Sequence, residues 1–322
     1  MNIRPRRNRK SEAIRNLVQE THLSVEQLVY PLFLVDGKNI RAEVPSLPGN
    51  YRLSIDEAMR TIGQCVSKNL MNFILFPSVH EKLKDKEATY GSHAENFYLK
   101  IASEIKAAFP ETTLISDVAM DPYSSDGHDG LVIDGKIDND KTLPILGKMA
   151  VAQAQAGFDI LGPSDMMDGR VGVIRMALDK AGFSNTSIMS YTAKYASAFY
   201  GPFRDALESA PKAGDKKTYQ MNPANKREAL IEAALDSAEG ADYLMVKPAL
   251  NYLDVIHLIK ENTNLPVAAY HVSGECAMLM AACKNGWLNY DYAMPETLLC
   301  IKRAGADIII SYFAKDFADM LA

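Results

Sequence analysis

ADYLMVKP, residues 241–248, is a short apolar run that ends in a lysine and a proline. It follows Glu239-Gly240, and this pattern is typical of a buried strand in a parallel sheet. The strand expected before it, Ser187–Ala193, is followed at once by Lys194. Two consecutive strands therefore end at a lysine, Lys194 and Lys247, although an ammonium group without a partner is costly to bury.

A lysine at the edge of a buried strand has two interpretations. Its ammonium group could reach water while its aliphatic stem packs against the strand. Alternatively, burial lowers its pKa, and the neutral amine attacks a carbonyl group to form an imine. The second lysine favours imine chemistry, because two ammonium groups at neighbouring strand ends lower each other's pKa.

Strand-like runs alternate with segments of helical period along the whole chain. The expected strands are Leu28–Leu34, Phe73–Val79, Thr113–Met120, Ile160–Asp165, Ser187–Ala193, Tyr243–Ala249, Pro266–Val272 and Asp307–Phe313. The expected helices are Ser54–Asn69, Ser92–Phe109, Thr142–Ala156, Gly169–Ala181, Asn225–Glu239, Tyr252–Asn262, Ser273–Lys284, Tyr290–Arg303 and Ala314–Ala322.

This alternation predicts an α/β protein with a (β/α)8 TIM barrel formed by residues 26–322. An N-terminal arm of residues 1–25 is expected before it, with a short helix at Ser11–Glu20 and Ser11 as its N-cap. A doubly wound open sheet is the alternative. It is disfavoured because no Gly-x-Gly-x-x-Gly motif follows the first strand.

The composition is that of an ordinary globular protein: 322 residues, of which 48% are hydrophobic and 23% are charged. The net charge of −5 argues against nucleic-acid binding, and no apolar run is long enough to span a membrane. The four cysteines are scattered and the basic start lacks a following apolar segment. We therefore expect a cytoplasmic protein, with a transit peptide as the alternative for Met1–Lys10.

Polar residues gather at the expected C-terminal ends of the strands, where TIM barrels place their active sites. These residues are Asp117, Asp121, Asp165, Asp168, Lys194, Lys247, His271, Ser273 and Tyr312. Each residue alone could be a helix cap or a residue at the barrel rim. Their shared position at one end of the barrel predicts a single active site.

Three connections are longer than ordinary βα loops. Asp121–Gly130 is rich in turn residues and acids, so it is either a solvated turn or a site for a hard cation. Tyr200–Ala224 is polar and has glycine and proline hinges, which predicts an active-site lid rather than a plain surface loop. Arg204 and Lys216 in this lid would bind an anionic substrate. Val35–Leu53 has no assigned chemistry.

Two imine-forming lysines suggest two carbonyl substrates or one diketone, and no organic cofactor motif is visible. The first hypothesis is therefore a lyase or condensing enzyme that works through imines. A metal-dependent hydrolase that uses the aspartates is the second hypothesis, and a barrel without catalytic activity is the third. Trapping with borohydride distinguishes them, because only an imine is reduced onto the enzyme.

Several segments resemble the porphobilinogen synthases, also called 5-aminolevulinate dehydratases. They are residues 163–171 (PSDMMDGRV), 194–197 (KYAS), 199–204 (FYGPFR), 219–223 (YQMNP), 245–248 (MVKP) and 270–275 (YHVSGE). The resemblance implies that two molecules of 5-aminolevulinate are condensed to porphobilinogen with loss of two waters, in tetrapyrrole and haem biosynthesis. It also implies a homo-octamer in which the arm embraces a neighbouring subunit.

The resemblance assigns roles to the residues of the expected site. Lys247 would hold the substrate that becomes the propionate side of the product, and Lys194 the one that becomes the acetate side. The substrate carboxylates would bind to Arg204, Lys216, Gln220, Ser273 and Tyr312. Lys216 stands where some members have arginine, so it keeps the charge but loses the bidentate contact. Asp117, Asp165 and Asp168 are expected to support the site.

The resemblance also bears on metals. Zinc-using members have three cysteines where this chain has Ala119, Asp121 and Asp129, so no active-site zinc is expected. Asp121 and Asp129 would hold a hard or monovalent cation, or no metal at all. Glu232 matches the glutamate that binds an activating Mg²⁺ at a subunit interface, which implies allosteric Mg²⁺.

Overall fold

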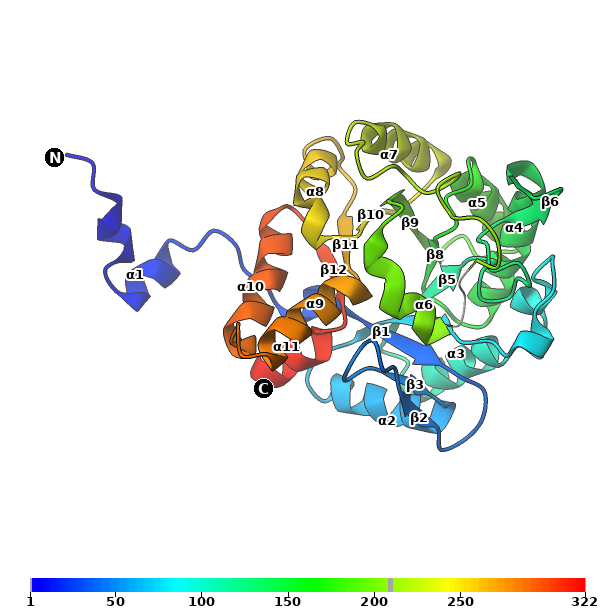
Figure 1. Ribbon diagram of the computed structural model, residues 1–322, viewed down its shortest axis with the longest axis horizontal. Helices are drawn as coiled ribbons and strands as arrows, with labels where there is room; N and C mark the ends of the chain where they lie inside the picture. Colours follow the sequence, from blue (N-terminus) through cyan, green and yellow to red (C-terminus); the bar gives the residue numbers. More distant parts are fainter. Residues whose placement is uncertain (1, 208–210, 322) are drawn as a thin grey trace.

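The computed structural model describes residues 2–207 and 211–321. Its central feature is a closed barrel of parallel strands (Figure 1). The strands are β1 (Leu28–Leu34), β4 (Asn72–Pro77), β5 (Thr113–Val118), β8 (Ile160–Pro163), β9 (Ser187–Lys194), β10 (Tyr243–Lys247), β11 (Val267–His271) and β12 (Ile308–Ser311). Pairing of β12 with β1, with Leu28 opposite Ile309, closes the barrel. The predicted (β/α)8 fold is confirmed.

An outer ring of helices covers the barrel (Figure 1). Its helices are α2 (Ile55–Val66), α3 (Phe97–Ala108), α4 (Asn139–Gln155), α5 (Arg170–Lys180), α7 (Glu228–Glu239), α8 (Leu253–Lys260), α9 (Ser273–Lys284), α10 (Tyr290–Arg303) and α11 (Ala314–Leu321). The last residue of the expected final helix, Ala322, lies outside the described residues. Gly240 ends α7 with a φ of 103°, a left-handed conformation that glycine adopts without steric cost.

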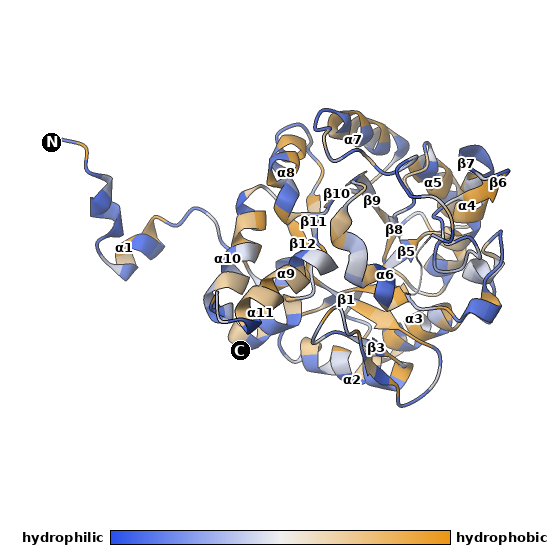
Figure 2. Cartoon of the chain, in the orientation of Figure 1, coloured by the Kyte–Doolittle hydropathy of each residue, from blue (hydrophilic) through white to orange (hydrophobic). Residues whose placement is uncertain are grey.

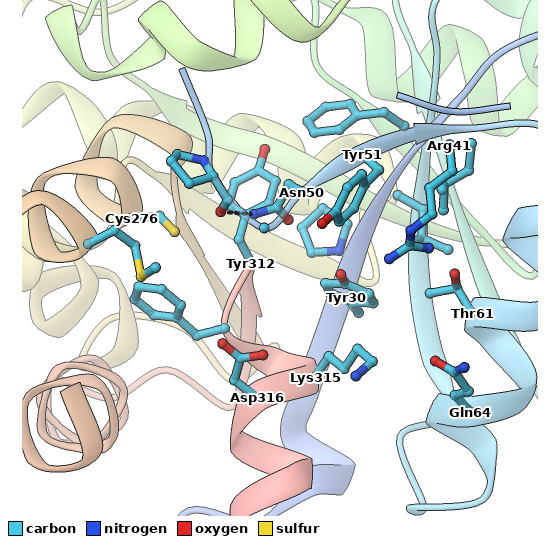
Figure 3. Close-up of a pocket in the computed structure, with 18 residues that line it drawn as sticks. Tyr30, Arg41, Asn50, Tyr51, Thr61, Gln64, Cys276, Tyr312, Lys315 and Asp316 are labelled. Atoms are coloured by element: carbon cyan, nitrogen blue, oxygen red, sulfur yellow. Dashed lines mark hydrogen bonds between the residues drawn. The ribbon is translucent and has the colours of Figure 1, made fainter. Parts of the chain in front are cut away.

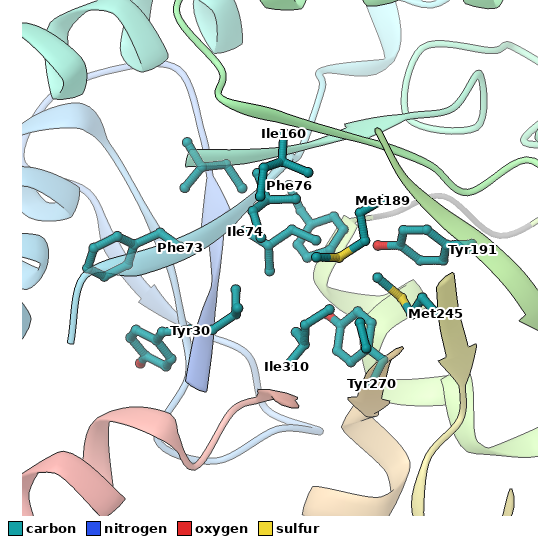
Figure 4. Packing of buried hydrophobic residues seen from close by; sticks show 14 of the residues in the cluster. Tyr30, Phe73, Ile74, Phe76, Ile160, Met189, Tyr191, Met245, Tyr270 and Ile310 are labelled. Carbon is teal, nitrogen blue, oxygen red and sulfur yellow. The ribbon is translucent and has the colours of Figure 1, made fainter. Parts of the chain in front are cut away.

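The barrel interior is packed with apolar side chains. Ile74, Met189, Met245 and Ile310 are completely buried and point toward a common centre (Figure 4). Burying one such side chain contributes about 1.5–3 kcal/mol, so these residues are a large part of the stability of the fold. Because these side chains fill the centre, the active site of such a barrel lies at one of its ends.

Two β-hairpins were not predicted. β2 (Arg41–Glu43) pairs with β3 (Tyr51–Leu53), and β6 (Leu131–Ile133) pairs with β7 (Lys136–Asp138). Strands of three residues are too short to show an alternating pattern. For the second hairpin the Asp134-Gly135 turn was a usable signal, since both residues have positive φ as a type I′ turn requires.

Helix boundaries moved for identifiable reasons. The helix expected from Ser92 begins at Phe97, because the Asn96 side chain accepts a hydrogen bond from the Tyr98 N–H and forms the N-cap. A further helix, α6 (Gly201–Leu207), lies in the expected lid. Pro202 in its first turn fits the preference of proline for this position.

The N-terminal segment extends away from the barrel (Figure 1) and is mostly hydrophilic, whereas β1 is strongly hydrophobic (Figure 2). It contains α1 (Glu12–Leu17), which is shorter than expected, and the Ser11 side chain accepts a hydrogen bond from the Ile14 N–H. Its apolar side chains Ile3 and Leu17 are more than 80% exposed. The division into arm and barrel at residue 25 stays a prediction.

Across residues 2–207 and 211–321, no helix combines the length and the apolar character that crossing a membrane requires.

Candidate active site

Lys194 and Lys247 lie opposite each other at the ends of paired strands β9 and β10. The Lys247 Nζ lies 4.4–5.4 Å from the centroids of a group of aromatic rings, those of Tyr191, Tyr200, Phe203 and Tyr270. Burial, and then the charge of Lys194, lower the pKa of Lys247 to about 7. A large fraction of Lys247 is therefore a neutral, nucleophilic amine near neutral pH.

Asp129 lies between Lys194 and the lid residue Lys216. Its Oδ1 is 3.5 Å from the Lys194 Nζ, and its Oδ2 is 2.7 Å from the Lys216 Nζ. Burial opposes the ionisation of Asp129, but the two lysines outweigh it and lower its pKa. Lys194 also donates a hydrogen bond to the Ser164 carbonyl. These contacts fix the Lys194 amine at the mouth of the barrel.

The same geometry bears on the expected cation at Asp121 and Asp129. The Lys216 Nζ lies 3.1 Å from Asp121 Oδ2 and 2.7 Å from Asp129 Oδ2, so its ammonium stands between the two carboxylates. Within the described ranges, no group of three or more His, Cys, Asp or Glu side chains could hold a metal ion. Lys216 supplies a positive charge at this position, and the expected cation at Asp121 and Asp129 stays a prediction.

The three supporting aspartates lie in different environments. Asp117 is buried, and burial together with the charge of Asp121 raises its pKa to about 7. Burial raises the pKa of Asp165 to about 6, and its Oδ1 accepts a hydrogen bond from the Met167 N–H. Asp168 is exposed just before α5. Its charge acts on Glu232, and no described contact joins it to the two lysines.

Helix α6 places the first part of the lid beside Lys247. The Phe203 N–H donates a hydrogen bond to the Ser273 Oγ at 3.0 Å, and the Phe203 ring packs edge-on against Phe76. Arg204, the next residue, is half-buried. Ser273 therefore holds the helix that carries Arg204, a contact that sequence reasoning did not anticipate.

Tyr312 and Gln220 complete the set of expected substrate-binding residues. The Tyr312 hydroxyl lies 3.2 Å from the Tyr270 hydroxyl, beside the rings that surround Lys247. Gln220 is buried, and its Oε1 has no hydrogen-bond partner among the described residues. The next residue, Met221, donates its N–H to the Lys194 carbonyl and ties the end of the lid to β9.

A polar cavity of about 230 Å³ lies beside this site and shares Tyr312 with it (Figure 3). It lies between β1, the β2–β3 hairpin, α2, α9 and α11. The Arg41 guanidinium stacks over the Tyr51 ring at 4.0 Å on one side of this cavity. The connection Val35–Leu53, which had no assigned chemistry, therefore forms one wall of this cavity.

Glu232 is half-buried on α7, in the outer ring. Burial is the largest cause that raises the pKa of Glu232, to about 7; the charge of Arg170 opposes this rise, and those of Asp236 and Asp168 favour it. The buried Arg170 guanidinium lies 3.1 Å from the Asp236 carboxylate. Glu232 is thus an incompletely neutralised carboxylate, the kind of oxygen ligand that a hydrated Mg²⁺ prefers.

The aromatic group around Lys247 was missed by sequence reasoning. Tyr270 comes directly before His271 at the end of an expected strand, so the strand pattern could have predicted its position at the mouth of the barrel. Tyr200 and Phe203 lie in the lid, whose path depends on long-range contacts such as the Phe203–Ser273 hydrogen bond. The strand pattern gave no signal for them.

Comparisons with known proteins agree with this architecture. Residues 2–320 match the family model described as delta-aminolevulinic acid dehydratase. Proteins of that name from Chlamydia pneumoniae and Bradyrhizobium diazoefficiens are 52% and 51% identical to this chain; each match covers 99% of it, and 96% and 91% of the respective relative. The solved Toxoplasma gondii ME49 delta-aminolevulinic acid dehydratase (porphobilinogen synthase), in complex with its reaction product porphobilinogen, superposes with a TM-score of 0.98 and 49% identity, over 99% of this chain and 92% of that one. This chain belongs to the delta-aminolevulinic acid dehydratase family.

Proposed function

We propose that this protein is a hydro-lyase that condenses two molecules of 5-aminolevulinate to porphobilinogen, with loss of two waters, in tetrapyrrole and haem biosynthesis. The observation that carries the proposal is the Lys247 amine, which burial and Lys194 hold near a pKa of 7 among aromatic rings. Such an amine attacks a ketone carbonyl without prior removal of a proton.

Each lysine binds one substrate molecule as an imine. The amine nitrogen forms a bond to the ketone carbon, the carbonyl oxygen leaves as water, and the resulting imine draws electrons from the adjacent carbons. Lys247 holds the molecule that becomes the propionate side of the product, and Lys194 the molecule that becomes the acetate side. Asp117, with a pKa raised to about 7, is suited to proton transfer beside them.

The substrate carboxylates are bound by residues on both sides of the lysines. Arg204 and Lys216 of the lid bind one carboxylate, with Gln220 beside them. Ser273 and Tyr312 bind the other. The buried Gln220 oxygen without a described partner supports this assignment, because a buried polar atom is stabilised when a ligand completes its hydrogen bonds.

Borohydride trapping tests the proposal. The protein is incubated with 5-aminolevulinate and borohydride, and the modified peptide is identified by mass spectrometry. We expect a reduced adduct on Lys247 and its loss in Lys247→Ala. Lys260→Ala, which removes a lysine paired with Asp307 away from the site, is the control and should still be trapped. An adduct elsewhere, with near-normal turnover of Lys247→Ala, would show that the lysine assignment is wrong.

We further propose that a Mg²⁺ ion held by Glu232 activates the enzyme and that the active site needs no zinc. Mg²⁺ at this position would neutralise part of the acidic charge on α7 and strengthen contacts between subunits. The active assembly is a homo-octamer in the cytoplasm, and 5-aminolevulinate is its small-molecule partner. Activity that is lost on treatment with a zinc-selective chelator and restored by zinc alone would contradict the metal assignment.

A further inference from the structure

The lid has two described limbs that approach the site from different sides. The first is α6, which carries Phe203 and Arg204, and the second is residues 211–221, which carry Lys216 and Gln220. Neither limb belongs to the barrel wall, so each needs contacts outside the lid to hold its side chains in place. Besides the Phe203–Ser273 and Met221–Lys194 hydrogen bonds, such contacts come from two long connections, Val35–Leu53 and Asp121–Gly130.

Arg52, on β3, contacts the C-terminal end of α6. Its Nε donates a hydrogen bond to the Ala206 carbonyl at 2.6 Å, and its Nη2 donates to the Asp205 carbonyl. Carbonyl groups toward the C-terminal end of a helix carry its partial negative charge, which favours contact with a guanidinium. The guanidinium binds both carbonyl groups at once, so Arg52 joins the helix that holds Arg204 to the β2–β3 hairpin.

His128, in the connection after β5, contacts both ends of the second limb. Its Nε2 lies 2.9 Å from the Ala213 carbonyl oxygen, and its Nδ1 lies 3.0 Å from the Tyr219 hydroxyl. Since a carbonyl only accepts, the Nε2 carries a hydrogen. The Tyr219 hydroxyl also lies 3.0 Å from Asp129 Oδ2, beside Lys216. His128 therefore binds the lid residue, Tyr219, whose hydroxyl donates to the carboxylate that orients the lysines.

We infer that Arg52 and His128 are positioning residues: their hydrogen bonds, which we call pins, hold the two limbs of the lid over the lysine site. Neither side chain has a described contact with Lys194 or Lys247, so each acts through the lid: Arg52 through Arg204, and His128 through Tyr219 and Lys216. Losing a pin increases the fraction of molecules with an open lid, and the apparent affinity for substrate falls in proportion. The kinetic part of this inference rests on the proposed function.

The experiment compares Arg52→Ala and His128→Ala with matched controls. Arg41→Ala removes an arginine from the same hairpin, where Arg41 stacks over Tyr51 and has no described contact with the lid residues. His80→Ala removes an exposed histidine that caps a short helix outside the lid. We measure KM and kcat for 5-aminolevulinate, the melting temperature, and the rate of tryptic cleavage after Lys212 and Lys217.

For Arg52→Ala and His128→Ala we expect KM to rise about tenfold or more, with kcat reduced less, and lid cleavage to accelerate severalfold at an unchanged melting temperature. Arg52→Lys should recover part of the affinity because it restores one donor. The controls should behave as wild type.

Wild-type KM and cleavage in both pin variants would overturn the inference. So would an equal effect of the controls, or a loss that follows a lowered melting temperature, since either result indicates general destabilisation. A wild-type protein that forms no porphobilinogen would refute the proposed function instead, while the cleavage rates would still report on the pins.

Discussion

At the scale of single residues, the pKa of Lys247 is the property that connects structure with chemistry. Burial is the larger cause of its lowering to about 7, and the charge of Lys194 is the next. Below pH 7 the amine is mostly protonated and unreactive, and above pH 7 it is mostly neutral. We predict that the rate of borohydride-trapped imine formation at Lys247 rises with pH and is half-maximal near pH 7.

The variant Lys194→Met provides the control for this prediction. Removing the neighbouring positive charge should raise the pKa of Lys247 and move the midpoint of trapping to higher pH. A wild-type midpoint above pH 9, or one that Lys194→Met leaves unchanged, would contradict the electrostatic explanation.

The same pKa predicts an effect on stability. The unfolded chain keeps Lys247 protonated up to its ordinary value of 10.5, whereas the folded protein releases the proton near 7. Between these values the unfolded state binds more protons, so the lysine lowers the free energy of unfolding most at low pH, and this cost declines as the pH rises. Lys247→Met should therefore raise the melting temperature more at pH 6.5 than at pH 9.5. Thermal unfolding at both pH values measures this, and a lower melting temperature at both would refute it.

Lys216 is the other residue whose burial determines its role. Its charge is buried with Asp121 and Asp129, and removing one partner of a buried ionic group leaves the others unpaired. We predict that Lys216→Met lowers kcat/KM at least about 100-fold, which corresponds to about 2.7 kcal/mol. Lys216→Arg should retain most activity. Lys217→Met is the control, because Lys217 pairs with Asp215 at the surface and such pairs contribute little. Comparable losses in both methionine variants would contradict this.

At the scale of elements, helix α6 is the part of the lid that brings a guanidinium to the substrate. We predict that Arg204→Ala raises KM about 10–100-fold, because it removes a charge-assisted contact worth roughly 1.5–3 kcal/mol. Arg227→Ala, an exposed arginine outside the lid, is the control and should leave KM unchanged. Steady-state kinetics with 5-aminolevulinate measure both. Unchanged KM and kcat in Arg204→Ala would show that this helix does not bind the carboxylate.

The barrel strands were predictable because each is a short, mostly apolar run in which nearly every residue is buried, and their ends moved by only a few residues. The β2–β3 hairpin was not, since Arg41–Glu43 is entirely exposed and resembles a polar loop. Helix α6 was also missed, because Gly201-Pro202 was interpreted as a hinge although proline is common in a first helical turn. Local sequence alone cannot distinguish a Gly-Pro hinge from a Gly-Pro pair that begins a helix.

The adjacent lysines were predictable for a topological reason. In a barrel, consecutive parallel strands end at the same rim, so Lys194 and Lys247 had to be neighbours once the fold was known. The contact of Lys216 with Asp121 was not predictable, because it joins residues 95 positions apart through the path of the lid. Asp168 was expected at the rim because it follows the fourth strand, yet it lies exposed in the turn before α5.

At the scale of the whole molecule, a single chain exposes several large apolar side chains to solvent. Trp287 and Tyr292 are 77% and 75% exposed, and the N-terminal segment exposes Ile3 and Leu17. Exposed aromatic residues of this kind are enriched in protein interfaces. They support the proposed octamer, in which contacts between subunits would cover them.

The last prediction joins this assembly to Glu232. Acidic charge gathers around Glu232 from Asp236, Asp168 and Glu228, and the charge of Arg170 opposes it. A Mg²⁺ ion ligated by Glu232 and waters would relieve that repulsion, and an ion that binds only the assembled form shifts the assembly equilibrium by mass action. We predict that millimolar Mg²⁺ increases turnover and the sedimentation coefficient of the wild type but not of Glu232→Ala. Glu228→Ala, on the same helix, is the control and should still respond. Equal stimulation of wild type and Glu232→Ala would place the ion elsewhere, and no stimulation of either would remove Mg²⁺ from the mechanism.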